Sequence, residues 1–204
     1  MRKIVVVFLV ISSLYGCVGK TGIVRDDLFP SNDYSQSMQK KVLFESEGMG
    51  LFVGRPSGLA SGAWSVSVDL KGIQEKAAGK VIEYLCSNVS PSPDHALKVL
   101  SSITDFKYYW KSSLSGTTPV ISFKMNIRAL DNDNTINTIE VKELPGDRFN
   151  STWSEFFRYL AFGTLGEVAS GNPAASRGSQ AVTDIALLAS YKIYHDEFPK
   201  ILER

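Results

Sequence analysis

The sequence predicts an α+β fold in which helices pack mainly on one face of an antiparallel sheet. Two observations predict this class. Apolar residues recur at every second position in 64–70 and across a long hairpin at about 119–143, which is the spacing of strands. They recur at helical spacing in 73–89 and 179–198. Strands, two helices, a strand meander and two helices therefore follow one another, as in an α+β domain.

The first predicted strands are the β-rich segments 41–46 and 51–53. Glu47–Gly50 separates them, so a hairpin is expected. Residues 54–62 have the Gly, Ser and Pro content of a loop. A half-buried strand follows, with one face apolar and the other polar: Trp64, Val66, Val68 and Leu70 against Ser65, Ser67 and Asp69.

Two helices are expected next. The first, 73–89, carries its apolar residues on one side and ends at Pro91. Ser92 is a good N-cap for the second, and Pro93 a good first helical residue. This second helix would turn Ala96, Val99, Leu100 and Ile103 inward. A break is expected near Thr104, since 106–110 has strand chemistry, although a continuing helix is the alternative.

The long hairpin has the clearest pattern. Its first strand alternates Ile121, Phe123, Met125, Ile127 and Ala129 with polar residues, and its second alternates Asn137, Ile139 and Val141 with polar residues. Asp131–Asn134 turns the chain between them, because Asn and Asp tolerate left-handed dihedrals. Pro145 and Gly146 end the second strand.

Two helices close the predicted fold. Thr152 to Glu155 has the spacing of a capping box and opens a helix rich in aromatic residues, which extends to about Val168. Residues 170–178 are expected to form a loop. The last helix is expected over 179–198, with Pro199 ending it.

Length and composition exclude several classes of protein. The 204 residues suit one domain, and a 44% hydrophobic content is too high for a disordered chain. A formal net charge of +1 provides no global field for nucleic acid, so no nucleic-acid partner is expected. Two cysteines cannot form a disulfide scaffold. Cys86 is expected to be a small buried residue.

The N-terminus has the layout of a secretory signal. Basic residues Arg2 and Lys3 precede an apolar run, and the stretch from Ile4 to Gly16 spans 13 residues. A helix needs about 20 residues to cross the hydrocarbon core, so a transmembrane helix is not expected. Leu14-Tyr15-Gly16-Cys17 then resembles the lipobox of bacterial lipoproteins, except that Tyr15 stands where a small residue is usual.

This resemblance implies that 1–16 is removed as a signal peptide and that Cys17 receives a diacylglyceryl group and an amide-linked acyl chain such as palmitate. Several acyl chains on one residue anchor a protein almost permanently. Val18 stands where an Asp would retain the protein in the inner membrane. The resemblance therefore implies the periplasmic face of the outer membrane, with a lipid anchor in the inner membrane as the alternative.

Organisation and charge of the mature chain follow from this processing. Loss of Arg2 and Lys3 from the 22 basic residues leaves 20 against 21 acidic residues, a net charge of −1. Attachment would therefore depend on lipid and not on headgroup attraction. Residues 17–38 mix Gly, Pro, Ser, Asn and Asp without periodicity, which predicts a flexible tether before a single domain at 39–204.

Motifs for catalysis or metal binding do not reach a consistent pattern. The turn from Asp131 fails the EF-hand spacing, because Ile136 stands in place of Gly and Lys142 in place of Glu. His95 and His195 each adjoin an acidic residue, but helical neighbours point in different directions. We therefore assign no catalytic residue, no metal ligand and no cofactor other than the lipid on Cys17.

Two aromatic clusters exceed what one core face needs. One lies within 106–110 and the other within 153–162, so some of these rings are expected to face outward. A partner-binding surface would use Tyr108, Tyr109, Trp110, Trp153, Phe156 and Phe162. Burial of the same rings in an aromatic core is the alternative.

These observations predict a non-enzymatic lipoprotein that serves as an accessory or assembly subunit of an envelope transport or secretion complex. The domain generically resembles accessory lipoproteins of such machines, including the auxiliary lipoproteins of ABC-type lipid transporters. One alternative is a carrier of lipid or another small ligand, with a pocket between sheet and helices lined by Phe123, Met125, Phe157 and Leu160. A cell-envelope hydrolase is the third, and it would need carboxylates or a histidine converging in a cleft.

Overall fold

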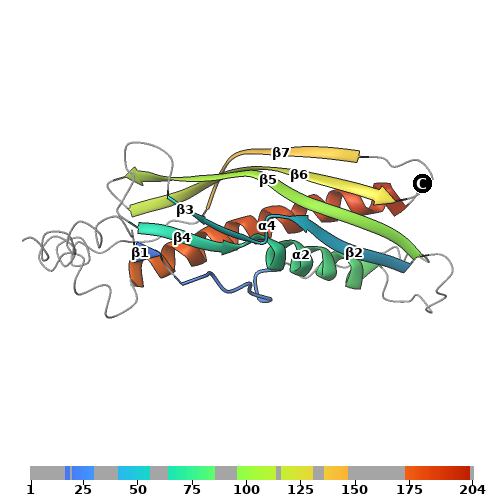
Figure 1. Cartoon of the computed structure of the whole chain (residues 1–204), viewed down its shortest axis with the longest axis horizontal. Coiled ribbons are helices and arrows are strands. Elements are labelled where there is room, and N and C mark those ends of the chain that lie inside the picture. The colour runs from blue at the N-terminus through green and yellow to red at the C-terminus, as the bar shows by residue number, and fades with distance from the viewer. Residues whose placement is uncertain are drawn as a thin grey trace, which may run out of the picture.

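The fold of the described residues consists of two sheets and two long helices. It is known from a computed structural model that describes residues 17–18, 20–29, 41–55, 64–85, 96–113, 116–130, 136–146 and 173–202. One sheet has the order β1-β4-β3, and the other has the order β2-β5-β6-β7. The strands are β1 (Cys17–Val18), β2 (Lys41–Gly48), β3 (Leu51–Gly54), β4 (Trp64–Asp69), β5 (Ala96–Ser113), β6 (Gly116–Leu130) and β7 (Ile136–Pro145), and the helices are α2 (Leu70–Leu85) and α4 (Pro173–Leu202) (Figure 1).

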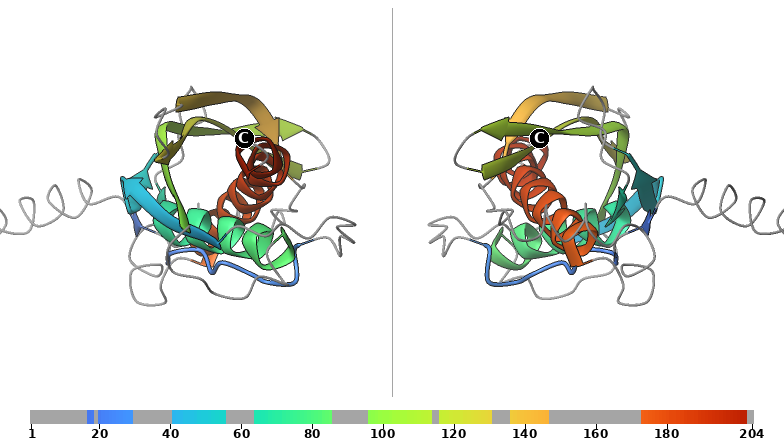
Figure 2. Two further views of the ribbon diagram at one scale, coloured as in Figure 1. Left: turned by 90° about the vertical axis from the view of Figure 1, so that its right-hand side faces the viewer. Right: turned by 90° about the vertical axis from the view of Figure 1, so that its left-hand side faces the viewer.

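The α+β class is confirmed, with both helices against one side of the sheets. Figure 2 looks along the long axis and shows the four-stranded sheet curving over α4, with α2 beside α4. The predicted long hairpin is confirmed as β6 and β7, which pair antiparallel from Val120↔Pro145 to Arg128↔Ile136. The sheet is mixed, however, because β2 pairs parallel with β5.

The predicted hairpin between 41–46 and 51–53 is wrong. Both strands exist, but β2 belongs to the four-stranded sheet and β3 pairs antiparallel with β4. Gly48 has a φ of 89°, so the chain leaves β2 in a conformation that favours glycine. Burial separates the two strands: Phe44 packs on Tyr194, while Phe52 packs on Phe106. Each aromatic ring fills a different part of the core.

The predicted second helix is also wrong, because residues 96–113 form the single strand β5. Leu97, Val99 and Ile103 are all buried, which is the period-two pattern that competes with the helical one. The break expected near Thr104 is a β-bulge, with a register shift between Thr104 and Lys107 and a φ of 54° at Asp105. Beyond the bulge, Phe106 and Tyr108 point into the core, so the extra residue changes which positions face inward.

The two predicted helices with described residues need smaller corrections. Helix α2 begins at Leu70, within the segment expected to be strand, and ends at Leu85. Helix α4 begins at Pro173, so 173–178 is helical and not a loop, and it continues past Pro199 to Leu202. Burial of Phe198 and partial burial of Ile201 hold the helix together around this proline. The predicted helix at 152–168, the turn at 131–134 and Cys86 lie outside the described residues.

A line of hydrogen bonds crosses the core and joins α2, β5 and α4. Ser101 Oγ donates to Gln74 Oε1 at 3.1 Å and lies 2.7 Å from the Tyr194 hydroxyl oxygen. Because serine has one proton, the Tyr194 hydroxyl donates to Ser101 Oγ. All three side chains are fully buried or nearly so. Burial raises the pKa of Tyr194, since the phenolate would lose its hydration.

Candidate functional site

Cys17, the predicted lipid attachment site, lies in β1 at one end of the long axis. Cys17 pairs with Trp64 and Val18 with Ser65, parallel to β4. Figure 1 shows that the starts of β4 and α4 and the hairpin end of β5 and β6 lie at the same extremity. We call this extremity the Cys17 end. The lipidation and the signal peptide 1–16 stay predictions.

Residues 20–29, which we call the strap, lie against the domain (blue in Figure 1). The Gly22 amide donates to Ser67 O at 3.2 Å, and Thr21 Oγ1 lies 2.8 Å from Ser67 Oγ. The Gln180 side chain accepts from the Ile23 amide at 2.8 Å and donates to Ile23 O at 2.9 Å. This part of the predicted tether at 17–38 is thus hydrogen-bonded to β4 and α4. The domain boundary at residue 39 stays a prediction.

The strap contacts β4 at Ser67, on the polar side of the strand, which the sequence predicts to be exposed. Ser65 and Ser67 are instead buried. The approach is very close at Gly22, where an added Cβ would lie 2.1 Å from Thr183 Oγ1. Only glycine fits at that distance. The backbone of the strap at Gly22 therefore lies directly against Thr183, with no room for a side chain between them.

Ion pairs and rings hold the rest of the strap. Arg25 pairs with Asp27, which raises the pKa of Arg25 and lowers that of Asp27. Lys76 Nζ on α2 lies 2.6 Å from Asp26 Oδ1. The Phe29 ring packs on Tyr191, with 5.0 Å between centroids. The strap thus runs from the Cys17 end across α4 to α2.

The predicted aromatic partner surface is only partly accessible. Tyr108 is 1% exposed and its hydroxyl donates to Gly54 O at 2.9 Å, so this residue belongs to the core and not to a surface. Burial raises its pKa. Tyr109 and Trp110 are half-buried, and Trp110 packs edge-on against Tyr108. Trp153, Phe156 and Phe162 lie outside the described residues.

A surface that the sequence did not predict lies on β3 and the residues just before it. Met49, Leu51 and Val53 are 57%, 54% and 51% exposed. We call these three residues the aliphatic row. Among the described residues β3 pairs only with β4, so it is an edge strand. Leu51 and Val53 alternate with Phe52 in the sequence, so the pattern indicates that the two sides of the strand differ. In so short a strand, however, the packing of Phe52 on Phe106 decides which side faces inward.

The outer face of the four-stranded sheet is polar, and several of its charges are paired. Lys98 Nζ lies 2.7 Å from Glu45 Oε2, and Lys124 Nζ lies 3.0 Å from Asp105 Oδ2. Each lysine donates a hydrogen bond that lowers the pKa of its carboxylate.

Among the described residues, the titratable side chains do not form a recognisable catalytic arrangement. His195 Nδ1 lies 3.1 Å from Asp196 Oδ1 at the surface of α4, while His95 lies outside the described residues. Within the described part of the chain, no three His, Cys, Asp or Glu residues gather as metal ligands. Neither described helix has the length and hydropathy needed to span a membrane.

An open groove of about 370 Å³ lies between the strap and α2. It is lined by Asp26, Glu75, Lys76, Gly79, Lys80 and Glu83. Lys80 Nζ already pairs with Glu83 Oε2 at 2.9 Å, as Lys76 does with Asp26. This is not the predicted apolar carrier pocket, because its lining is mostly charged and includes neither Phe123 nor Met125, which are buried in the core. Phe157 and Leu160 lie outside the described residues.

Comparison with known proteins gives only distant similarity. No family model and no curated protein matches the chain. A Xanthomonas campestris protein of the family DUF330 covers 90% of this chain and 97% of its own, at 11% identity and a TM-score of 0.40. A minor lipoprotein from Acinetobacter baumannii covers 79% and 95%, at 8% identity and a TM-score of 0.30. Similarities of this size assign neither a family nor a function.

Proposed function

We propose that this protein is a lipid-anchored accessory subunit of the bacterial envelope that binds a partner protein along β3. The observation that carries the proposal is the aliphatic row, which exposes Leu51 and Val53 on the edge strand β3 and Met49 just before it. The proposed location is the periplasmic face of the outer membrane, and the proposed role is docking without catalysis. This role would suit an assembly or transport complex of the envelope.

The aliphatic row suits protein recognition for two reasons. Three side chains, each more than half exposed, lie within five residues, and exposed apolar patches mark interaction sites. An edge strand also offers unpaired backbone groups, to which another chain adds as a further strand. Soluble proteins usually protect such edges with charges or proline. Met49 to Val53 contains neither.

The position of Cys17 supports the anchoring part of the proposal. The strand that contains Cys17 pairs directly with β4, and the strap that follows is hydrogen-bonded to the domain. Acyl chains on Cys17 would therefore hold the Cys17 end close to the bilayer, with the long axis leading away from it. The edge of β3 would be presented at the side of the molecule, within reach of an envelope complex.

Photocrosslinking in intact cells tests the docking surface. A photoreactive phenylalanine analogue replaces Leu51, and a matched control replaces Leu188, an exposed leucine on α4. We expect a discrete crosslinked product from position 51 and none from position 188. Replacement of Met49 and Val53 by Ser in the same chain should remove that product. Equal products at both positions, or none at position 51, would contradict docking along β3.

Fractionation of Cys17→Ser tests the anchor. We expect the variant to appear in the soluble periplasmic fraction or to accumulate as an uncut precursor, because the thiol that receives the lipid is absent. Cys86→Ser is the matched control and should fractionate like the wild type. Mass spectrometry of the native N-terminal peptide gives the direct readout. A bare thiol at Cys17 would refute the anchor.

A further inference from the structure

The Cys17 end carries an excess of basic side chains. Among the described residues, 20–24, 53–55, 64–68, 108–113, 116–121 and 173–183 lie at this end. The charged residues in these ranges are all cations, namely Lys20, Arg55, Lys111 and Arg177, and the adjoining end of β7 adds one carboxylate, that of Glu143. All four are exposed. The chain as a whole is close to neutral, so this end is a local concentration of positive charge.

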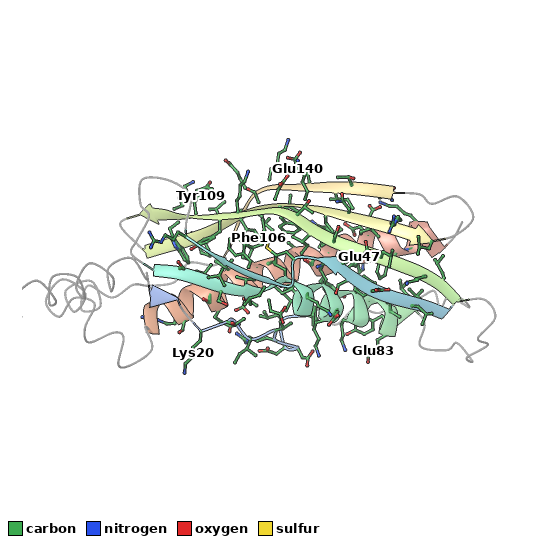
Figure 3. All side chains as sticks on the ribbon, in the orientation of Figure 1. Lys20, Glu47, Glu83, Phe106, Tyr109 and Glu140 are labelled. Carbon is green, nitrogen blue, oxygen red and sulfur yellow. The ribbon has the colours of Figure 1, made fainter. Side chains whose placement is uncertain are left out.

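Contacts in the structure bring the four cations together from distant parts of the sequence. The Lys20 amide donates to Ser176 Oγ at 3.1 Å, which sets Lys20 beside the first turns of α4 and Arg177. Arg55 follows Gly54, whose carbonyl accepts the hydrogen bond from Tyr108 on β5. Lys111 lies on the same strand near its hairpin end, opposite Thr118. Figure 3 shows Lys20 and Tyr109 at this extremity.

The surroundings of Lys20, Arg55 and Lys111 differ from those of the paired cations on β5 and β6. On the outer face of the sheet, Lys98, Lys124 and Arg128 each lie within 4.0 Å of a carboxylate. Among the described residues, Lys20, Arg55 and Lys111 have no carboxylate within ion-pair distance. Their charge is therefore available to an external anion, and its field extends about 8 Å at physiological salt.

We infer that the Cys17 end binds the anionic headgroups of phospholipids. The inference rests on the lipid anchor of the proposed function, because acyl chains on Cys17 would bring this end to a bilayer surface. Lysine and arginine near an anionic bilayer are attracted to it. The half-buried rings of Tyr109 and Trp110 add side chains that suit the membrane interface. The local charge at this end acts at short range, so the net charge of −1 for the mature chain does not oppose it.

Amine labelling of the native lipidated protein tests this inference. The protein is reconstituted into phosphatidylcholine vesicles with or without phosphatidylglycerol, and lysine acetylation is read by mass spectrometry. We expect phosphatidylglycerol to slow acetylation of Lys20 and Lys111 by about threefold or more, and high salt to remove the protection. Lys142 and Lys192, which are exposed on β7 and α4, should not change.

A charge-matched pair of variants separates a local contact from a general charge effect. One variant carries Lys20→Gln, Arg55→Gln and Lys111→Gln, and the control carries Lys142→Gln, Lys192→Gln and Lys200→Gln. Hydrogen exchange of peptides covering 108–122 is measured on both vesicle types. We expect phosphatidylglycerol to protect these peptides in the wild type and the control but not in the first variant. Thermal midpoints confirm that all three chains are folded.

The outcomes distinguish failure of this inference from failure of the anchor. A lipidated protein that shows the same labelling on both vesicle types, or protection that is insensitive to salt, overturns the headgroup contact and leaves the anchor intact. Protection in native envelopes but not on phosphatidylglycerol vesicles also overturns it and indicates an acidic protein at this end. A bare Cys17 and no incorporation into vesicles would overturn the anchor itself.

Discussion

Helix α4 makes two contacts of opposite character. Toward the core it presents large rings such as Tyr194 and Phe198, which pack against Phe44 and each other. Toward the strap it presents Ser179 and Thr183, small residues that let the backbone of Gly22 approach closely. The first contact is stabilised by buried area and the second by a close fit and hydrogen bonds. Loss of volume should therefore damage the first, and added volume the second.

The largest effect is expected from removing volume in the core. Phe123 is 1% exposed and stacks on Phe106, with 6.1 Å between centroids. Phe123→Ala should lower the free energy of unfolding by about 3–5 kcal/mol, because the cavity cannot close around rigid neighbours. Urea denaturation measures the change. Lys142→Ala on β7 is the control and should stay within about 0.5 kcal/mol. A loss below about 1 kcal/mol for Phe123→Ala would show that this region is loosely packed.

Adding volume to the strap contact should have the next largest effect. A side chain at position 22 would overlap Thr183, so Gly22→Val should displace the strap and cost about 1–3 kcal/mol. Hydrogen exchange of residues 20–29 should increase, while exchange in β6 changes little. Gly79→Ala is the matched control, because its Cβ meets nothing within 4 Å on α2 and should stabilise the chain by about 0.5–1 kcal/mol. Unchanged exchange of the strap in Gly22→Val would contradict the close fit.

A smaller effect is expected from removing the Tyr194 hydroxyl, which is hydrogen-bonded to Ser101 in the core. Tyr194→Phe should cost about 1 kcal/mol, since Ser101 keeps its bond to Gln74. Burial raises the pKa of Tyr194, so folding favours the protonated form. Stability is thus complete below the ordinary tyrosine pKa and falls above about pH 10, by about 1.4 kcal/mol per pH unit for each such group. The variant should show a shallower alkaline loss; an identical slope would contradict this assignment.

The smallest effect is expected at Thr183, on the strap side of α4. Its hydroxyl oxygen is buried and has no hydrogen-bond partner among the described residues. Thr183→Val keeps the shape and removes the unsatisfied group, so the free energy of unfolding should rise by about 0.5 kcal/mol. Thermal and urea denaturation measure the gain. A loss of stability would show that the hydroxyl contributes to strap binding.

The parts of the fold that the sequence predicted are those where one pattern runs without interruption. The alternation from Ile121 to Ala129 and from Asn137 to Val141 has no helical competitor, so β6 and β7 were predicted correctly. A helix would also fit the spacing of Ala96, Val99, Leu100 and Ile103. This segment forms a strand because 96–103 pairs with β2, which lies 50 or more residues away in the sequence. The bulge at Asp105 moves the inward-facing positions from odd to even residue numbers. The sequence alternation is therefore interrupted there, and a single strand over 96–113 was not predicted.

The candidate site divides in the same way. Cys17 is a local signal, because the residues that specify its processing are adjacent to it. The aliphatic row was not predicted, since which side of β3 faces outward depends on where Phe52 finds Phe106. The strap was expected to be a tether because its composition resembles one, and its contacts use backbone groups that leave no apolar pattern. Tyr108 was expected at a surface and is in the core.

By itself, the sequence determined the fold class, the long hairpin and the position at which a lipid is expected, because each depends on residues that are neighbours along the chain. Only the tertiary structure decided the partner of β2, the course of the strap and the gathering of Lys20, Arg55, Lys111 and Arg177 at one end. These features join residues separated by up to 157 positions. Their energy comes from contacts that exist only after the chain has folded.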